Sequence, residues 1–402
     1  MKRSRLFWTG VVTGLAVGVI LLLLVFFGTS IFTLATGKSL SLGAMMDSSV
    51  QTKLEMLNSV IDKNYVVYDE SIEQIDRVEG MYKGLVASLG DPYSDYYTVE
   101  ELNQEQEDDS GMFGGIGVSI GYDRETRSSY VAGFAKNSPG KDAGLKEDDI
   151  FYAVDGQLCE NLSQSEIVAL CRGEAGTEVE IVVLRGDTGE KVTVKITRDV
   201  IENETVDYEK IEDGIGYIQI TEFNQLTAKQ FKEAKEQAQA DKIKKLVLDL
   251  RSNYGGDVSA VLSVCDDIMA DGVIVSTKNK NGEGDIYSAT GESSMDCEIV
   301  VLTNGYTASA AEILTGALKD NKLATVMGTK TYGKGIMQTV FPLQDGSAIK
   351  LTTYMYYTPS GVNIQGSGIN PDIELEFDAD AYSKDKKNDN QKSAAVEYLK
   401  KH

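Results

Sequence analysis

The chain has 402 residues, of which 42% are hydrophobic and 25% are charged, and its formal net charge is −23. This length allows two or three domains. Such an acidic chain would be repelled by phosphates and is not expected to bind nucleic acid. The single histidine is His402, the last residue. A Ser-His-Asp triad, a Cys-His pair and a histidine-ligated zinc site are therefore close to excluded.

The N-terminal region, residues 1–40, is expected to anchor the chain in a membrane. Residues 6–27 carry no charge and are nearly all apolar, which is long enough to cross a bilayer. Lys2, Arg3 and Arg5 precede them, so the positive-inside rule places the N-terminus in the cytoplasm and the following chain outside it. A cleaved signal peptide is the alternative, but its apolar region should be shorter and an A-x-A cleavage site should follow.

Residues 41–105 are expected to form a helical segment. Apolar residues recur at helical spacing through 50–102, and the glycine and proline of 90–92 interrupt the pattern. The acidic stretch 100–109 is expected to be a solvated connector. Because the segment has more apolar positions than one short helix needs, we expect it to mediate a homodimer.

A glycine-containing loop opens a predicted strand within residues 106–199; its residues are Gly115, Ile116, Gly117 and Val118. Such a loop can turn its N–H groups toward the terminal carboxylate of a peptide that adds a strand to the sheet edge. With a predicted helix over 162–171, this region resembles a PDZ domain, and the loop is its expected substrate-binding site. A generic β-hairpin is the alternative, and a dinucleotide loop has the wrong spacing.

Two further local patterns in this region have unremarkable interpretations. Ser138 and Lys141 match the S-x-x-K motif of penicillin-recognising enzymes, but the proline and glycine between them favour a helix start. Cys159 and Cys171 flank a predicted helix, which separates them beyond the bridging limit. Buried free thiols are expected, and the sequence does not decide whether Cys265 and Cys297 are bridged.

Strands and helices alternate from residue 211 onward, which indicates an α/β core over residues 200–378. The predicted strands are 216–220, 246–250 and 299–303, and the predicted helices are 227–240, 257–270 and 309–320. The tail, residues 379–402, is polar and is expected to be loosely held.

Ser309 is the candidate nucleophile of this core. It lies after a predicted strand, at a helix N-terminus, where unpaired N–H groups favour developing negative charge. The N–H of Ala310 is a natural oxyanion donor, and a second donor is expected from Gly255 or Gly256, where the backbone can approach a substrate closely. The alternative is that Ser309 only caps the helix.

Lys334 is the candidate general base, because no histidine is available for that role. It must be neutral, although the ordinary pKa of lysine is about 10.4. Lowering that pKa to about 7–8 requires roughly 4 kcal/mol, which desolvation between Gly333 and Gly335 can supply. Gln338 lies four residues on and is expected, in an extended strand, to share its face and orient the amine.

Four segments carry a resemblance to a known family; they read GDPYS (90–94), DLRSNYGG (249–256), NGYTASAAE (304–312) and TYGKGIMQ (331–338). Together they resemble the carboxyl-terminal processing peptidases, which are serine proteases with a Ser-Lys dyad and a PDZ domain. The resemblance extends from about Ser49 to Glu376 and implies a crotonase-like spiral of ββα units. Ala311 departs from it, because many relatives carry serine there.

The resemblance implies a membrane-anchored serine endopeptidase that cleaves extracytoplasmic proteins near or from their C-termini. The PDZ domain would bind the substrate tail and gate access to Ser309 and Lys334. We expect no metal and no cofactor. A catalytically silent binding protein and a crotonase-like acyl-CoA enzyme are the alternatives. The intact Ser-Lys pair argues against the first, and the extracytoplasmic placement argues against the second.

Overall fold

The computed structural model describes residues 46–66, 74–186, 189–291 and 294–402. The chain divides into two units, residues 1–78 and 79–402. The membrane helix predicted over 6–27 lies outside the described residues. Among the helices that are described, none is long and apolar enough to cross a bilayer.

The first unit contains helix α3 (Ser48–Asn64) and the start of α4 (Gln74–Ala87). Asp47 begins α3 as its N-cap, since its carboxylate accepts the N–H groups of Ser49 and Val50. No residue of α3 is buried, and its apolar positions are exposed. The exposed apolar side chains on this helix are Met56, Leu57, Val60 and Ile61.

The segment predicted to be helical over 50–102 contains α3 and α4, and after the predicted break at 90–92 the chain forms strand β1 (Asp95–Tyr97) before α5 (Val99–Ser110). The acidic stretch predicted to be a connector lies almost entirely within α5. Thr98 and Glu101 form a capping box at its start, and Gly111 ends it in the left-handed conformation. These caps make a helix out of a sequence whose charges suggested a loop.

The second unit is built on a six-stranded sheet in the order β10-β11-β12-β15-β16-β19. The first pair is antiparallel and the remaining pairs are parallel. Strands join the sheet in chain order from one edge to the other, without the reversal of a doubly wound sheet. The strands are β10 (Val206–Glu212), β11 (Ile215–Ile220), β12 (Lys245–Asp249), β15 (Glu298–Thr303), β16 (Ala324–Gly328) and β19 (Ile373–Glu374).

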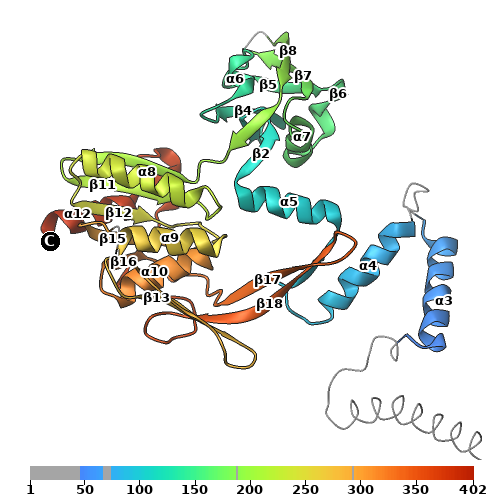
Figure 1. Ribbon diagram of the computed structural model, residues 1–402. Helices are drawn as coiled ribbons and strands as arrows, with labels where there is room; N and C mark the ends of the chain where they lie inside the picture. Colours follow the sequence, from blue (N-terminus) through green and yellow to red (C-terminus); the bar gives the residue numbers. More distant parts are fainter. Residues whose placement is uncertain (1–45, 67–73, 187–188, 292–293) are drawn as a thin grey trace, which may run out of the picture. The chain divides into compact units, whose positions relative to one another are not determined.

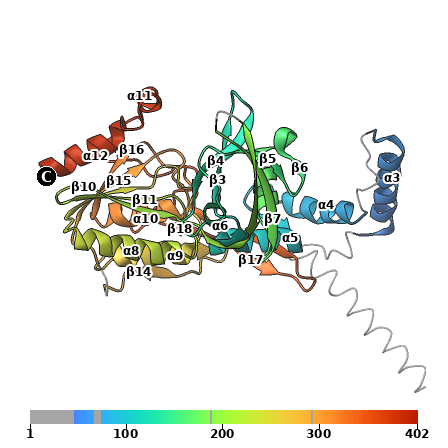
Figure 2. The same ribbon diagram turned by 90° about the horizontal axis from the view of Figure 1, so that it is seen from above.

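Helices cover both faces of this sheet (Figures 1 and 2). One face packs against α8 (Thr227–Ala240), α9 (Val258–Ile268) and α10 (Ala310–Asp320). On β12, Leu246 and Leu248 face these helices, whereas Val247 faces the other side, where α12 (Asn390–Lys401) lies. Burial on both faces explains the continuous apolar runs of the central strands.

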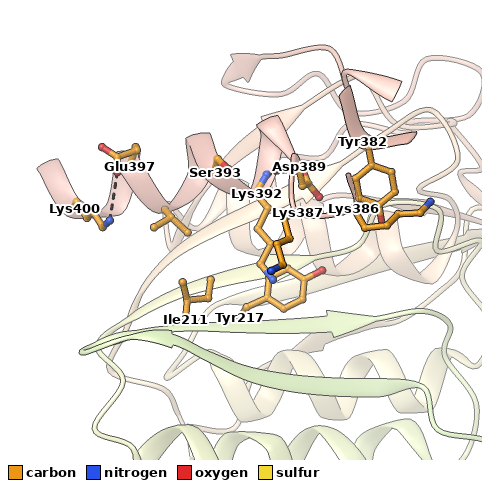
Figure 3. Close-up of a pocket in the computed structure, with 11 residues that line it drawn as sticks. Ile211, Tyr217, Tyr382, Lys386, Lys387, Asp389, Lys392, Ser393, Glu397 and Lys400 are labelled. Atoms are coloured by element: carbon orange, nitrogen blue, oxygen red, sulfur yellow. Dashed lines mark hydrogen bonds and ion pairs between the residues drawn. The ribbon is translucent and has the colours of Figure 1, made fainter. Parts of the chain in front are cut away.

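The C-terminal tail, predicted to be loosely held, instead forms α11 (Ala379–Lys384) and α12. Ala395 and Leu399 are fully buried against the sheet. Figure 3 shows Lys392 beside Tyr217, with its ammonium 3.8 Å from the ring centre. The prediction failed because a few apolar residues at helical spacing are hidden among lysines.

A buried ion-pair network holds α12 to the sheet. Arg251 binds Asp249 through Nε (2.9 Å) and Asp389 through Nη2 (2.7 Å), and Tyr217 donates its hydroxyl to Asp249 (2.8 Å). Asp249 and Arg251 therefore form a structural ion pair, and Arg251 extends it to the C-terminal segment. Its partners lie more than a hundred residues apart in sequence, so the network fastens the end of the chain to its centre.

A second, five-stranded sheet places the remaining site segments. Its strands are β1, β13 (Val273–Asn279), β14 (Ile286–Ser288), β17 (Ile336–Pro342) and β18 (Ala348–Tyr357). The long hairpin of β17 and β18 pairs with β1, so the segment just before β1 lies beside the hairpin.

The PDZ region forms a six-stranded sheet with β3 at one edge, in the order β3-β4-β5-β7-β8, and β6 pairs with β5. Helix α7 (Gln164–Cys171) begins after Ser163 and contacts β3, close to the helix predicted over 162–171. Helix α6 (Pro139–Asp142) begins at Ser138, whose hydroxyl accepts the N–H of Lys141, as the helix-start interpretation predicted. All four cysteines are free thiols. The strands of this sheet are β3 (Val118–Asp123), β4 (Ser128–Phe134), β5 (Ile150–Val154), β6 (Gln157–Leu158), β7 (Glu178–Arg185) and β8 (Glu190–Thr197). Strands β2 (Met112–Gly115) and β9 (Asp199–Glu202) pair in a separate two-stranded sheet, and a short 3-10 helix spans Cys159–Asn161.

Candidate active site

Ser309 occupies a strained turn between the central strand β15 and helix α10. Its φ is 54° and its ψ is −118°, a conformation that a residue with a side chain rarely adopts. The turn is fastened to the loop after β12, because Thr307 donates its hydroxyl to the carbonyl of Leu250 (2.8 Å) and Ala308 donates its N–H to that of Asn253 (2.9 Å). This fastening compensates for the strain at the serine.

Two glycines of the loop after β12 bring the backbone against the serine turn. A Cβ at Gly255 would lie 2.7 Å from the Cβ of Ser309, and one at Gly256 would lie 1.9 Å from the carbonyl oxygen of Phe223. No other residue fits at either position without displacing backbone. Both glycines are therefore required by close packing within the protein, and the close approach to a substrate stays a prediction.

Of the three N–H groups expected as oxyanion donors, two are unpaired among the described residues. The N–H of Gly255 donates to Oδ1 of Asn253 (2.8 Å), so it is not free to bind an oxyanion. Within the described part of the chain, the N–H groups of Ala310 and Gly256 have no protein acceptor. Of the two glycines offered as the second donor, Gly256 is the one whose N–H is unpaired within the described residues, and its role as a donor stays a prediction.

The carboxylate of Glu312 joins the serine turn to the lysine loop. It accepts the N–H groups of Ser309 (2.9 Å), Gly333 (2.8 Å) and Lys334 (2.8 Å), and the hydroxyl of Thr331 (2.6 Å). The side chain is fully buried, and burial raises its pKa while the four donors act against this rise. An ionised carboxylate, which only accepts hydrogen bonds, matches a shell made only of donors.

Tyr356 links the serine turn and the lysine loop through its hydroxyl. Its hydroxyl donates to the carbonyl of Ser309 (3.1 Å) and also contacts the carbonyl of Lys334. The residue is almost completely buried, on β18. Neither Tyr356 nor the clamp role of Glu312 was predicted. Glu312 follows Ser309 by three residues, a capping spacing that could have flagged it.

Lys334 lies in a close-packed loop, as the flanking glycines predicted. A Cβ at Gly333 would lie 2.7 Å from the N of Gly368, and one at Gly335 would lie 2.6 Å from the N of Gln365. Burial lowers the pKa of Lys334, the nearby Lys350 lowers it further, and the charges of Asp91 and Glu105 oppose this. The physical cause expected from the sequence, desolvation, is the largest contribution.

A segment more than two hundred residues upstream forms one wall around Lys334. The ammonium of Lys334 lies 4.6 Å from the centre of the Tyr93 ring. This contact favours the charged form of the lysine and so opposes the lowering of its pKa by burial. Ser94 holds this segment to β18 by accepting the N–H of Thr352 (3.0 Å). The hydrogen bond with Tyr332 raises the pKa of Tyr93 to about 12, so Tyr93 is neutral at pH 7 and is not a base.

Gln338 makes no hydrogen bond to Lys334 among the described residues, so its expected role in orienting the amine stays a prediction. Lys334 precedes β17, and the register shifts between Met337 and Gln338, so the strand alternation that was invoked does not connect them. The amide of Gln338 donates to the hydroxyl of Thr352 (3.0 Å). Its side chain still lines the same cavity as Ser309 and Lys334.

This cavity has a volume of about 400 Å³. It contains the predicted nucleophile, the predicted base, Gln338 and Gly256, which the sequence places far apart. Apolar side chains also line the cavity. The further lining residues are Glu105, Asp109, Tyr254, Asp257, Val258, Ile313, Ile336, Met337, Val340, Lys350 and Tyr356.

The predicted peptide-binding loop of the PDZ domain does not line this cavity. Gly115 pairs with Asp199 between β2 and β9, Ile116 is buried in the domain core, and Val118 begins the edge strand β3. Gly117 has a φ of 65°, and a Cβ there would lie 2.8 Å from the Cα of Ser138. In the residues described, the N–H groups of Ile116 and Gly117 have no protein acceptor, as a carboxylate-binding loop requires.

Comparison with known proteins gives consistent similarities. The profile of peptidase family S41 matches residues 214–375, and a PDZ domain profile matches residues 130–185. A carboxy-terminal-processing protease of Bartonella bacilliformis is 36% identical over 74% of this chain and 69% of its own length. The carboxy-terminal processing protease CtpA of Bacillus subtilis is 34% identical over 85% of this chain and 73% of its own. A solved S41 protease structure from Bacteroides fragilis shares the fold, with a TM-score of 0.53, 17% identity, and coverage of 83% of this chain and 92% of that one.

The carboxylate of Glu312 generates a prediction, because one side chain aligns both reactive segments. Glu312→Gln should place an amide donor against backbone N–H donors, at a cost of about 2–4 kcal/mol in the free energy of unfolding. Proteolysis should fall by roughly 10²-fold at temperatures well below the melting transition.

Thermal unfolding and peptide cleavage rates, measured for the wild-type protein and for Glu312→Gln, test this prediction. Glu236→Gln, on the exposed face of α8, is the matched control and should change neither. Wild-type activity and stability in Glu312→Gln would show that the clamp does not align the site.

Proposed function

Because this chain belongs to the carboxyl-terminal processing peptidases of family S41, which are serine peptidases, we propose that it cuts its substrates with Ser309 as nucleophile and Lys334 as general base. The observation that carries the proposal is the shared cavity. It holds a strained serine and a lysine whose pKa burial lowers, and one carboxylate aligns their backbones.

In the proposed reaction, the neutral amine of Lys334 takes the proton of the Ser309 hydroxyl as its Oγ attacks the substrate carbonyl carbon. The N–H groups of Ala310 and Gly256 stabilise the oxyanion that forms. The Lys334 ammonium then protonates the leaving amine. Water, activated by the same lysine, hydrolyses the acyl-enzyme. Gln338 and Thr352 shape the wall beside the amine.

The dyad can be tested directly. Ser309→Ala and Lys334→Ala should each lower peptide cleavage by about 10³-fold or more, with little change in melting temperature. In the wild type, activity should rise with pH as Lys334 loses its proton. Because burial lowers the pKa of Lys334, the midpoint of this rise should lie below that of a free lysine.

Initial rates of peptide cleavage measured across pH, with circular dichroism of each variant, check both statements. Substantial activity in folded Lys334→Ala protein would refute the dyad.

The substrate class follows from the PDZ domain under the same proposal. Strand β3 is a free sheet edge beside α7, and the loop before it presents unpaired N–H groups. A substrate tail can add a strand there and place its terminal carboxylate on the loop. Tail binding would deliver proteins to the cavity and gate its activity. The predicted anchor over 6–27 would place this reaction on extracytoplasmic proteins at the membrane.

Reading of the carboxylate is best tested on the substrate rather than on the loop. Any side chain at Gly117 would collide with Ser138, so a substitution there damages the domain itself. A protein substrate with a free C-terminus should be cleaved about 10-fold faster than its C-terminally amidated form, because a charged hydrogen bond is lost. Equal cleavage rates for the two forms would contradict tail recognition.

We also propose that the chain forms a homodimer through its N-terminal helical segment. The exposed apolar positions of α3 support this, because a solvated helix gains little from them. Sedimentation of the chain from Asp47 onward should give a dimer at micromolar concentration, and Leu57→Asp with Ile61→Asp should give a monomer. A monomer in both proteins would remove the proposal for this segment.

A further inference from the structure

A second lysine, Lys350, lines the cavity that contains Ser309 and Lys334. It lies on β18 two residues before Thr352, so the two side chains project from the same face of the strand. Their partners across the ladder are Val340 and Gln338. This face of the β17–β18 hairpin therefore lines the cavity that also contains Ser309 and Lys334.

Lys350 has polar partners that keep it charged. Its ammonium contacts the carboxylate of Glu105 on α5 and lies 3.1 Å from the hydroxyl of Tyr97. Burial lowers the pKa of Lys350, but these partners outweigh burial and raise it. Lys350 is therefore an ammonium at neutral pH.

Lys334 has the opposite environment in the same cavity. Its amine lies against the Tyr93 ring, and within the described residues it has no carboxylate within ion-pair distance. Two like charges in one cleft repel each other, so a fixed charge on one lysine disfavours protonation of the other. Among the described residues that line the cavity, Lys350 is the one cation besides Lys334.

We propose that Lys350 is a positioning residue of the reaction, whose fixed charge keeps Lys334 neutral, and that Glu105 sets how much of that charge Lys334 experiences. This rests on the proposed dyad. The acidic groups around the lysine would otherwise favour its protonated form. The titratable and charged groups of the elements packed around this site are Asp91, Tyr93, Tyr97, Glu105, Asp109, Tyr254, Asp257, Glu312, Tyr332, Lys350 and Tyr356.

The position of Glu105 connects this electrostatic control to the PDZ region. Helix α5 carries Glu105 and ends at Gly111, directly before β2. The carbonyl of Asp109 near its end accepts the N–H of Gln225 in the core (3.0 Å). A shift of α5 that moves Glu105 away from Lys350 would expose Lys334 to the full charge of Lys350 and lower its proton affinity.

The test is the pH profile of kcat/KM, which reports the free enzyme's base. In the full-length chain, Lys350→Met should raise the midpoint by roughly 0.5–1.5 pH units, with activity near neutral pH lowered and restored at high pH. Lys350→Arg keeps the charge and should keep the wild-type midpoint. Glu105→Gln removes the opposing charge and should move the midpoint downward.

Lys244→Met is the matched control, because Lys244 forms an exposed ion pair with Asp296. This variant should leave the pH profile of kcat/KM unchanged. A merely structural role of Lys350 predicts lower activity at every pH with an unchanged midpoint, and that result would overturn the proposal. If Lys350→Met does not fold, Lys350→Gln and Glu105→Gln decide, and unmoved midpoints in both overturn it.

These outcomes are distinct from a failure of the proposed function. Loss of activity in Ser309→Ala and Lys334→Ala, together with an unmoved profile in the Lys350 variants, refutes only the role of Lys350. Activity that persists without Lys334 refutes the dyad itself.

Discussion

The active site depends on one buried carboxylate. Glu312 accepts four hydrogen bonds, which come from the serine turn and from the lysine loop. Because a carboxylate has lone pairs on two oxygens, one side chain can fix the relative position of two backbone segments without covalent links. The burial that makes these bonds strong also makes an unpaired partner costly, so the four donors and Glu312 hold one another in place.

The environment of the base is assembled from segments that are distant in sequence. Tyr93 precedes β1, Lys334 precedes β17, and Lys350 lies on β18. The pairing of β1 with β18 brings the first of these to the others. A lysine that must be neutral needs low polarity nearby, and a hairpin laid over an α/β core provides walls that a single loop could not.

The opposite face of the central sheet has a different role. Arg251, in the loop that also carries Gly255 and Gly256, is bound to Asp249 and Asp389 away from the cavity. Its ion pairs are shielded from water and join this loop to the C-terminal helix. Two glycines that need close backbone packing and a structural arginine thus share one short segment, and one of the glycines, Gly256, lines the cavity.

The sequence by itself determined the elements whose signals are local and the residues whose chemistry is rare. The core strands and helices were predictable because apolar runs, caps such as Asp257, and helical spacing lie within a few residues of one another. Ser309 and Lys334 could be proposed as nucleophile and base from the sequence, because a chain whose single histidine is terminal leaves few bases. The free state of Cys159 and Cys171 and the close packing of the glycines around Lys334 also followed from local reasoning, whereas the sequence left the state of Cys265 and Cys297 open.

Only the tertiary structure decided the parts that depend on distant partners. Asn253 accepts the N–H of Gly255, whereas the N–H of Gly256 has no acceptor among the described residues, and no spacing reveals this difference. Tyr356, Tyr93 and Lys350 reach the site because sheet pairing brings them there. Residues 390–401 form helix α12 because three of its apolar side chains pack against the central sheet, although its sequence is rich in lysine. The physical reason is common to all: the partner that gives each residue its role is contributed by folding, not by its neighbours in the chain.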